Sequence, residues 1–324
     1  MISAANYTIE KRLIDEVEVY VLGDKSAGVE VYVAPSLGNN AYAMLVNGKN
    51  VMYWPTGSPA KATFAGNPLL WPWANRIDSE EYFANGKKYR LNPDLGNYRK
   101  DGNKQPIHGM LSATKEWKVV RSQANGKVAE VTSRIEFWRY PEWMAQFPFA
   151  HNIEMTYRLR GGVLEVETMV ENLSNQPLPL SLGYHPYFQL PDVPRDEWKV
   201  TLPAKERVVL SPTLVPTGAR EPNPYSGTVE LKGKSLDDVF TSLTTPAVFS
   251  VESGGKKLEV EYGPKYPVAV VYAPPGRSFI CFEPMTGITN AFNAAQRGQY
   301  QELQTIPAGG KWQEAFRVKA TGIR

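Results

Sequence analysis

Apolar and polar residues alternate along two neighbouring segments near the middle of the chain. Every second residue is apolar from Ile153 to Leu159, and after two glycines the alternation largely resumes from Leu164 to Glu171. A period of two places apolar side chains on one face of a β-strand and polar side chains on the other. We therefore predict a half-buried β-hairpin whose turn is Gly161–Gly162.

Three Asn-Gly pairs separate other apolar segments, at Asn47–Gly48, Asn85–Gly86 and Asn125–Gly126. Asn-Gly is the dipeptide that short hairpin turns favour, because these turns need positive φ angles. Further strands are expected at residues 268–273, 278–284 and 311–320. No window shows a sustained 3.6-residue apolar period, so helices should be short and few. The pattern predicts an all-β protein folded as a large antiparallel two-sheet sandwich.

The composition narrows the range of partners and compartments. The chain has 324 residues and no evident boundary, so we expect residues 1–324 to form a single domain. Lys and Arg number 36 against 33 Asp and Glu, and a net charge of +3 gives little reason to expect a nucleic-acid partner. The single cysteine, Cys281, excludes an intrachain disulfide and a cysteine-rich zinc cluster. With neither a signal-peptide pattern nor a long apolar run, we expect a cytoplasmic protein without membrane association.

The histidines are the first candidates for chemistry. His108, His151 and His185 do not pair at the three- to five-residue spacing of zinc ligands, so no metal site is expected. The sequence also has no nucleophile elbow, phosphate-binding loop or dinucleotide fingerprint. Acid–base chemistry is the class that remains.

Two of these histidines lie in turns, where functional residues concentrate. His108 stands in a Pro-Ile-His-Gly segment, and His185 lies between Gly183 and Pro186 with aromatic residues around it. The alternative for His185 is a structural histidine in an aromatic cluster, which is the commoner fate of a lone histidine. His151 begins an alternating strand, so packing in the core or a contact at the rim of a site explains it at least as well as a chemical role.

A carboxylate and an aromatic segment add to these candidates. Glu283 ends an apolar strand, where it must find partners or shift its pKa, unless it emerges into solvent there. Trp71, Trp73 and Arg76 offer flat apolar faces beside a forked donor, which suits the C–H faces and hydroxyls of a sugar. Aromatic core packing is the alternative for the two tryptophans.

Five short motifs occur in a fixed order along the chain. They are WANRI, PIHG, GYHPYF, LDDVF and CFEP, which begin at residues 73, 106, 183, 236 and 281. In this order the motifs resemble the aldose 1-epimerase (galactose mutarotase-like) family. The resemblance runs from about Asn67 to the C-terminus, whereas residues 1–50 resemble the family's opening strands only loosely. The family fold is a single β-supersandwich, which agrees with the strand pattern.

The resemblance implies an isomerase that interconverts the α and β anomers of an aldose and uses no cofactor. Glu283 would be the general base that takes the proton of the anomeric hydroxyl, and His185 the general acid that protonates the ring oxygen. His108 would hydrogen-bond the substrate and stabilise charge that develops on oxygen. Substrate-binding roles fall on Arg76, Asn75, Asp237 and Trp73. Asp238 competes with Asp237 for its role.

Other functions stay open at this point. Residues 66–73 and the spacing from His108 to Trp117 also resemble a hexose-6-phosphate 1-epimerase branch of the superfamily. The cations available for a phosphate are Arg76, Arg99, Lys100, Lys104, Arg139 and Arg297. Residues 74–77 match the free-sugar pattern, so we expect a free aldohexose such as glucose or galactose as the substrate of a monomer or homodimer. A non-catalytic carbohydrate-binding protein and a polysaccharide-active hydrolase or lyase are the alternatives from other classes.

Overall fold

The computed structural model describes residues 6–61, 63–225 and 227–324, and β-strand dominates their regular structure. The helices in this part of the chain are α1 (Pro141–Gln146), α2 (Ala291–Gln296) and the 3-10 helices η1 (Pro35–Leu37), η2 (Pro93–Leu95), η3 (Phe137–Arg139) and η4 (Arg195–Glu197). None of these has the length and apolar composition that crossing a membrane requires. The prediction of an all-β protein with few short helices is confirmed.

The largest sheet has nine antiparallel strands. In spatial order they are β11 (Lys118–Ala124), β12 (Ala129–Glu136), β13 (His151–Arg160), β14 (Val163–Asn172), β28 (Lys311–Thr321), β24 (Lys256–Tyr262), β23 (Ala247–Ser253), β18 (Lys199–Thr201) and β21 (Thr228–Glu230). β28 pairs with β14 on one side and with β24 on the other. This one strand therefore joins the two halves of the sheet.

Two further large sheets and three strand pairs complete the architecture. The five-stranded sheet consists of β1 (Tyr7–Ile14), β2 (Val17–Asp24), β3 (Val29–Ala34), β4 (Asn40–Val46) and β5 (Lys49–Asn50). The eight-stranded sheet runs β20 (Pro216–Pro222), β19 (Ala204–Leu210), β22 (Leu236–Leu243), β25 (Val268–Ala273), β26 (Ile280–Met285), β16 (Gly183–Tyr184), β6 (Leu69–Leu70), with β17 (Tyr187–Phe188) also on β26. The pairs are β7 (Glu81–Ala84) with β8 (Lys87–Arg90), β9 (Arg99–Lys100) with β10 (Pro106–Ile107), and β15 (Leu178–Leu180) with β27 (Gln304–Ile306).

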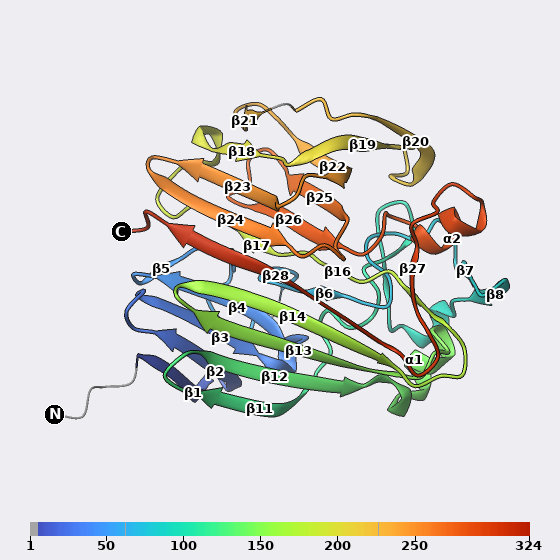
Figure 1. Cartoon of the computed structure of the whole chain (residues 1–324), viewed down its shortest axis with the longest axis horizontal. Helices are drawn as coiled ribbons and strands as arrows, with labels where there is room; N and C mark the ends of the chain where they lie inside the picture. The colour runs from blue at the N-terminus through green and yellow to red at the C-terminus, as the bar shows by residue number, and fades with distance from the viewer. Residues whose placement is uncertain (1–5, 62, 226) are drawn as a thin grey trace.

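The apolar face of the nine-stranded sheet packs against the other two large sheets (Figure 1). β2 lies against β12 and β13 at one end. Nearer the other end, the ring of Phe249 on β23 lies 5.8 Å from that of Phe282 on β26, and Tyr184 on β16 lies 5.0 Å from Phe316 on β28. The predicted sandwich is confirmed, with the difference that one of its layers consists of two separate sheets.

The predicted hairpins form. Arg160 pairs with Val163 across the turn Gly161–Gly162, and both glycines have positive φ. Asn47–Gly48 and Asn85–Gly86 also turn with positive φ, between β4 and β5 and between β7 and β8. Strands β11 and β12 pair around the turn that contains Asn125–Gly126. The residues of these turns therefore determine the pairing of the neighbouring strands that they connect.

Gly109 holds a loop against the segment that carries Trp71, and we expect this contact to require glycine. Its φ is +63°, and a Cβ added there would lie 2.0 Å from the carbonyl oxygen of Trp71. Replacing Gly109 with alanine should lower the free energy of unfolding by about 3 kcal/mol or more, because backbone strain and a backbone clash add. Denaturant unfolding measures this loss.

Gly86→Ala is the matched control, since Gly86 also has positive φ, at +71°, but nothing lies within 4 Å of its added Cβ. This variant should lose only about 1 kcal/mol, the strain of the left-handed backbone alone. Equal losses in the two variants would show that the approach to Trp71 contributes nothing.

Candidate active site

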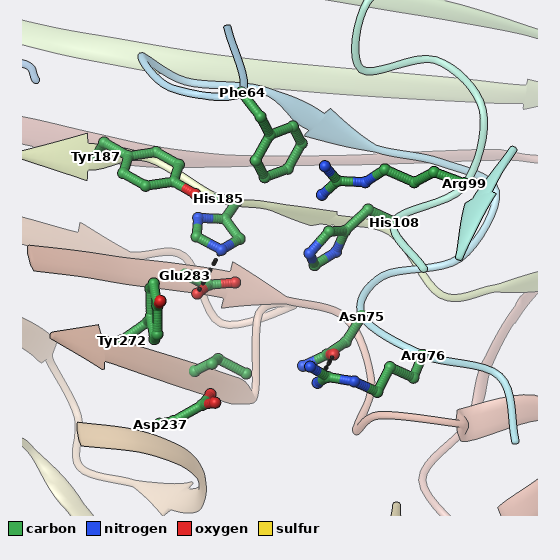
Figure 2. A pocket seen from close by; sticks show the side chains of 11 residues that line it. Phe64, Asn75, Arg76, Arg99, His108, His185, Tyr187, Asp237, Tyr272 and Glu283 are labelled. Carbon is green, nitrogen blue, oxygen red and sulfur yellow. Dashed lines mark hydrogen bonds and ion pairs between the residues drawn. The ribbon is translucent and has the colours of Figure 1, made fainter. Parts of the chain in front are cut away.

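A cavity of about 320 Å³, whose lining side chains Figure 2 shows, lies on the face of the eight-stranded sheet opposite to the main core. Phe282 of β26 enters the main core, and the next residue, Glu283, points to the opposite face, as successive residues of a strand do. The volume is in the range of small-molecule sites. The cavity therefore uses the second face of a sheet whose first face is core.

Adjacent strands supply the floor of the cavity. Glu283 on β26 is in register with Val270 on β25, and Asp237 on β22 is in register with Tyr272 on β25. All four residues line the cavity. Cross-strand pairing and the two-residue period together bring these side chains to one face.

Loops supply the opposite wall. Asn75 and His108 line the cavity, and both adopt left-handed backbone, with φ of 54° and 63°. The amide of His108 donates to the carbonyl oxygen of Asn75 over 2.8 Å, so each segment holds the other in place. Non-glycine residues in this conformation are costly and persist where the surroundings enforce them, commonly at functional sites.

Arg76 is fixed by two acceptors before any ligand arrives. Its Nε donates to Asp101 Oδ2 over 2.6 Å, and its Nη1 donates to Asn75 Oδ1 over 2.8 Å. Asp101 also accepts from the backbone amides of residues 103 and 105, and these bonds together with Arg76 hold the pKa of its carboxyl below the usual value although burial opposes this. Arg76 is therefore a preorganised, charge-balanced donor on the cavity wall.

His185 and Glu283 face each other inside the cavity, as the dashed line in Figure 2 marks. His185 Nε2 lies 3.3 Å from Glu283 Oε1, and both side chains are almost fully buried. The imidazole stacks on Tyr187 with ring centroids 4.6 Å apart. Glu283 Oε2 and His185 Nδ1 have no hydrogen-bond partner among the described residues, so each group keeps capacity for a ligand.

Burial moves the pKa values of this pair toward the neutral forms. It raises the pKa of Glu283 well above the usual range, with Asp237 adding to the rise and Arg76 opposing it. It lowers the pKa of His185 to about 3, with the charges of Arg99 and Arg76 adding to the decrease. Both shifts favour a protonated Glu283 beside a neutral His185, so burial favours one proton held between the two side chains across their 3.3 Å contact. Such a pair can accept a proton at one end and donate one at the other.

His108 is the third titratable ring at this wall. Its centroid lies 5.3 Å from that of His185 and 5.2 Å from that of Phe64. Burial holds the pKa of His108 well below its usual value, and His185, Arg99 and Arg76 lower it further. A neutral imidazole donates from one ring nitrogen and accepts at the other, so His108 can hydrogen-bond a hydroxyl in either direction.

Among the residues that the structure describes, one group has ligand atoms close enough together for a metal ion. The ligand atoms of His185, Cys281 and Glu283 lie within 4.8 Å of one another, and all three residues are buried. Cys281 and Glu283 lie on β26 and His185 lies between β16 and β17, far away in sequence, so histidine spacing could not reveal the group. Burial and the carboxylates of Glu283 and Asp237 raise the pKa of the Cys281 thiol well above its usual value.

The cavity brings together most of the residues that the sequence singled out. Six of the seven line it, namely Glu283, His185, His108, Arg76, Asn75 and Asp237. Asp238, the competitor of Asp237, instead accepts from Arg207 Nη1 over 2.9 Å.

Trp73 is the residue that the structure places elsewhere. Its side chain is 1% exposed in the main core, with its ring 6.0 Å from that of Tyr98. Trp71 is also in the core. The expected sugar platform of tryptophans is therefore corrected to core packing, and the rings that do line the cavity belong to Phe64, Tyr187 and Tyr272.

Sequence reasoning missed these aromatic residues for different reasons. Tyr187 lies two residues after His185, and Val270 and Tyr272 alternate on one strand, so a period of two could have found them. Phe64 lies in an irregular segment with no periodic signal. Arg99 was considered only as one of several available cations.

His151 is a core residue, in agreement with the packing interpretation. Its Nε2 accepts from Trp71 Nε1 over 2.9 Å, its Nδ1 donates to the carbonyl oxygen of Phe149 over 2.5 Å, and its ring stacks on Phe137. Burial lowers its pKa to about 3. Both ring nitrogens are satisfied only in the neutral form, so this histidine resists protonation.

We expect His151 to make the fold sensitive to acid. The unfolded chain binds a proton at this residue below about pH 6.5, whereas the folded chain does so only near pH 3. The stability that it contributes is therefore complete above pH 6.5 and is lost as pH falls, by about 2 kcal/mol at pH 5. In His151→Gln, the decrease in unfolding free energy from pH 7 to pH 5 should be smaller by that amount. An unchanged decrease, or an NMR titration of His151 near pH 6.5, would contradict this.

Comparison with known proteins gives one family match and several distant relatives. Residues 33–319 match the family model described as aldose 1-epimerase. The uncharacterized protein YihR of Escherichia coli (strain K12) is 23% identical over 232 residues, which cover 70% of this chain and 71% of YihR. The crystal structure of Slr1438 from Synechocystis sp. PCC 6803 has a TM-score of 0.77 at 23% identity, covering 96% of this chain and 98% of that one. A galactose mutarotase-like protein from Clostridium acetobutylicum has a TM-score of 0.85 at 19% identity, covering 97% and 98%.

Proposed function

The chain belongs to the aldose 1-epimerase family, and from this premise we propose that it interconverts the α and β anomers of a free aldohexose such as glucose or galactose. The observation that carries the proposal is the buried contact of 3.3 Å between His185 Nε2 and Glu283 Oε1 inside the cavity. The anomeric oxygen and the ring oxygen of a pyranose are bonded to the same carbon. A base and an acid that act on these two oxygens must therefore lie side by side.

Ring opening uses the proton that the pair shares. The reactive form has a Glu283 carboxylate and a His185 imidazolium, which differ from the resting pair only in the position of one proton. Glu283 takes the proton of the anomeric hydroxyl, and the C1–O5 bond breaks with its electron pair going to the ring oxygen. His185 protonates that oxygen, and an open-chain aldehyde results.

Reclosure reverses the roles of the two side chains. Rotation about C1–C2 turns the other face of the aldehyde toward the C5 hydroxyl. His185 takes the proton of that hydroxyl as the C1–O5 bond forms, and Glu283 returns a proton to the aldehyde oxygen. Protons and electrons balance over the cycle, so this chemistry needs no cofactor.

The remaining polar side chains bind and orient the sugar. Neutral His108 hydrogen-bonds the substrate and stabilises charge that develops on oxygen. Arg76 and Asn75 hold hydroxyl groups, and Asp237 accepts from another hydroxyl. Because Arg76 already donates a hydrogen bond to Asn75, these side chains need little reorientation on binding.

Anomer exchange measured by NMR tests the proposal. We expect the exchange of glucose or galactose to accelerate in proportion to the concentration of the protein, above the spontaneous rate in the same buffer. Heat-denatured protein is the control for catalysis by buffer or trace metal. If glucose, galactose and glucose 6-phosphate all exchange at the spontaneous rate, the protein is not a mutarotase of these sugars.

A further inference from the structure

Arg99 is a cation at the cavity without a carboxylate partner. It lines the cavity, and its guanidinium lies 3.9 Å from the centre of the Phe64 ring. Its neighbour Lys100 pairs with Glu80, but none of the salt bridges in the described part of the chain includes Arg99. Burial lowers the pKa of Arg99.

The other arginine of the cavity shows the contrast. Arg76 is bonded to Asp101 over 2.6 Å, and its charge is balanced before a ligand binds. Stacking on Phe64 satisfies the flat face of Arg99 but none of its five N–H donors, which lie at the edge of the guanidinium. A planar fork of donors with one free positive charge matches a carboxylate or a phosphate better than a single hydroxyl.

The position of Arg99 relative to the catalytic pair suggests where such a group would be on a sugar. Arg99 lies on the side of His185 and His108, and its charge lowers the pKa of both. Asp237 lies on the opposite side of the cavity, nearer Glu283 (Figure 2). In the proposed reaction His185 serves the ring oxygen and Glu283 the anomeric oxygen. The ring oxygen is bonded to C5, which carries C6, so substituents at C6 project from the His185 side.

We propose that the preferred substrates of this site are aldoses that carry an anionic group at C6, bound by Arg99. The proposal rests on the proposed mutarotase function and narrows its substrates: glucose and galactose would be turned over, but less efficiently than sugars with an anionic C6. A hexuronate carries a carboxylate at this position and a hexose 6-phosphate a phosphate, and both present oxygen pairs to the fork. Although the cavity wall partly desolvates its guanidinium, the Arg99 residue remains exposed to solvent, so a bound anion keeps part of its hydration and its desolvation costs little.

The test compares anionic with neutral sugars in matched variants. Exchange NMR gives kcat/KM for glucose, glucuronate and glucose 6-phosphate with wild type, Arg99→Met and Lys100→Met. We expect wild type to prefer at least one anionic sugar over glucose. In Arg99→Met, the ratio of kcat/KM for that sugar to kcat/KM for glucose should fall about tenfold or more, because a charge-assisted pair is lost. Lys100→Met removes a neighbouring charge that is already paired and should keep the wild-type ratio.

The ratio is the decisive readout, since removing Arg99 also changes the electrostatics of His185 and His108 for every sugar alike. No preference for either anionic sugar in wild type, or an equal ratio in wild type and Arg99→Met, would overturn the proposal. A preference for glucuronate alone would assign a carboxylate, and a preference for glucose 6-phosphate alone a phosphate.

A binding measurement separates this inference from the function on which it rests. Methyl glucuronide cannot open its ring, so calorimetric titration against methyl glucoside reports recognition without turnover. Tighter binding of the glucuronide, lost in Arg99→Met but not in Lys100→Met, would support the anion site even if no sugar were turned over. Equal affinities for the two glycosides would count against a carboxylate at C6, and methyl glucoside 6-phosphate tests the phosphate in the same way.

Discussion

Replacing Glu283 with glutamine is expected to lower kcat for anomer exchange by about a thousandfold, which is the typical rate contribution of a positioned acid–base group. The amide keeps the size of the side chain and can donate to His185 Nε2, but it cannot take the proton of the anomeric hydroxyl. Sugar affinity should change little, because Arg76, Asn75 and Asp237 still line the cavity. Exchange NMR over a range of sugar concentrations separates kcat from KM.

The variant should not be less stable than wild type at neutral pH. Burial raises the pKa of Glu283 above its unfolded value, so in wild type the unfolded chain loses this proton first as pH rises. Folding therefore becomes less favourable between the two pKa values, and glutamine has no such dependence. Glu261→Gln, at an exposed position of β24, is the control and should keep full turnover. Wild-type turnover in Glu283→Gln would remove Glu283 from the mechanism.

Replacing His185 with glutamine should lower kcat by between a hundredfold and a thousandfold, because the imidazole that faces Glu283 at 3.3 Å and protonates the ring oxygen is lost. The double variant with Glu283→Gln should lose little more than the single variants, since the two groups act as one unit. Losses that multiply would show that they act independently.

The pH dependence of kcat/KM distinguishes the roles of the two residues. A pair that works with one shared proton gives a bell, since activity falls when both groups are protonated and when neither is. Residual activity of Glu283→Gln needs a protonated His185 and should only fall as pH rises. Residual activity of His185→Gln needs an ionised Glu283 and should only rise. If His185 had only a structural role, His185→Gln would keep the bell-shaped pH dependence of kcat/KM with a lower maximum.

Much of the fold was predictable because its signals are local. The alternation in residues 153–171 and the Asn-Gly turns act over a few residues, and the structure confirms the hairpins they predict. What the pattern could not give is the division of one layer into two sheets, which depends on pairing between strands distant in sequence. A two-residue strand such as β16 (Gly183–Tyr184) also has no pattern of its own and exists through its neighbours.

The candidate site was only partly predictable from the sequence. Motifs indicated His185, Glu283 and His108, but composition alone could not separate a tryptophan in the core from one on a cavity wall, and Trp73 proved to be in the core. The significance of Arg99 comes from what is near it, namely Phe64 at 3.9 Å and no described carboxylate in ion-pair contact. Such a relation appears only when loops distant in sequence meet.

The central place of β28 has a consequence for synthesis of the protein. The other eight strands of the nine-stranded sheet precede β28 along the chain, so β14 and β24 leave the ribosome before the strand that pairs with both. Until β28 arrives, each presents a row of unpaired backbone donors and acceptors, the kind of edge on which nascent chains associate wrongly. Both edges are unpaired together in the interval between the emergence of β24 and that of β28, so wrong association of the nascent chain is most favoured there.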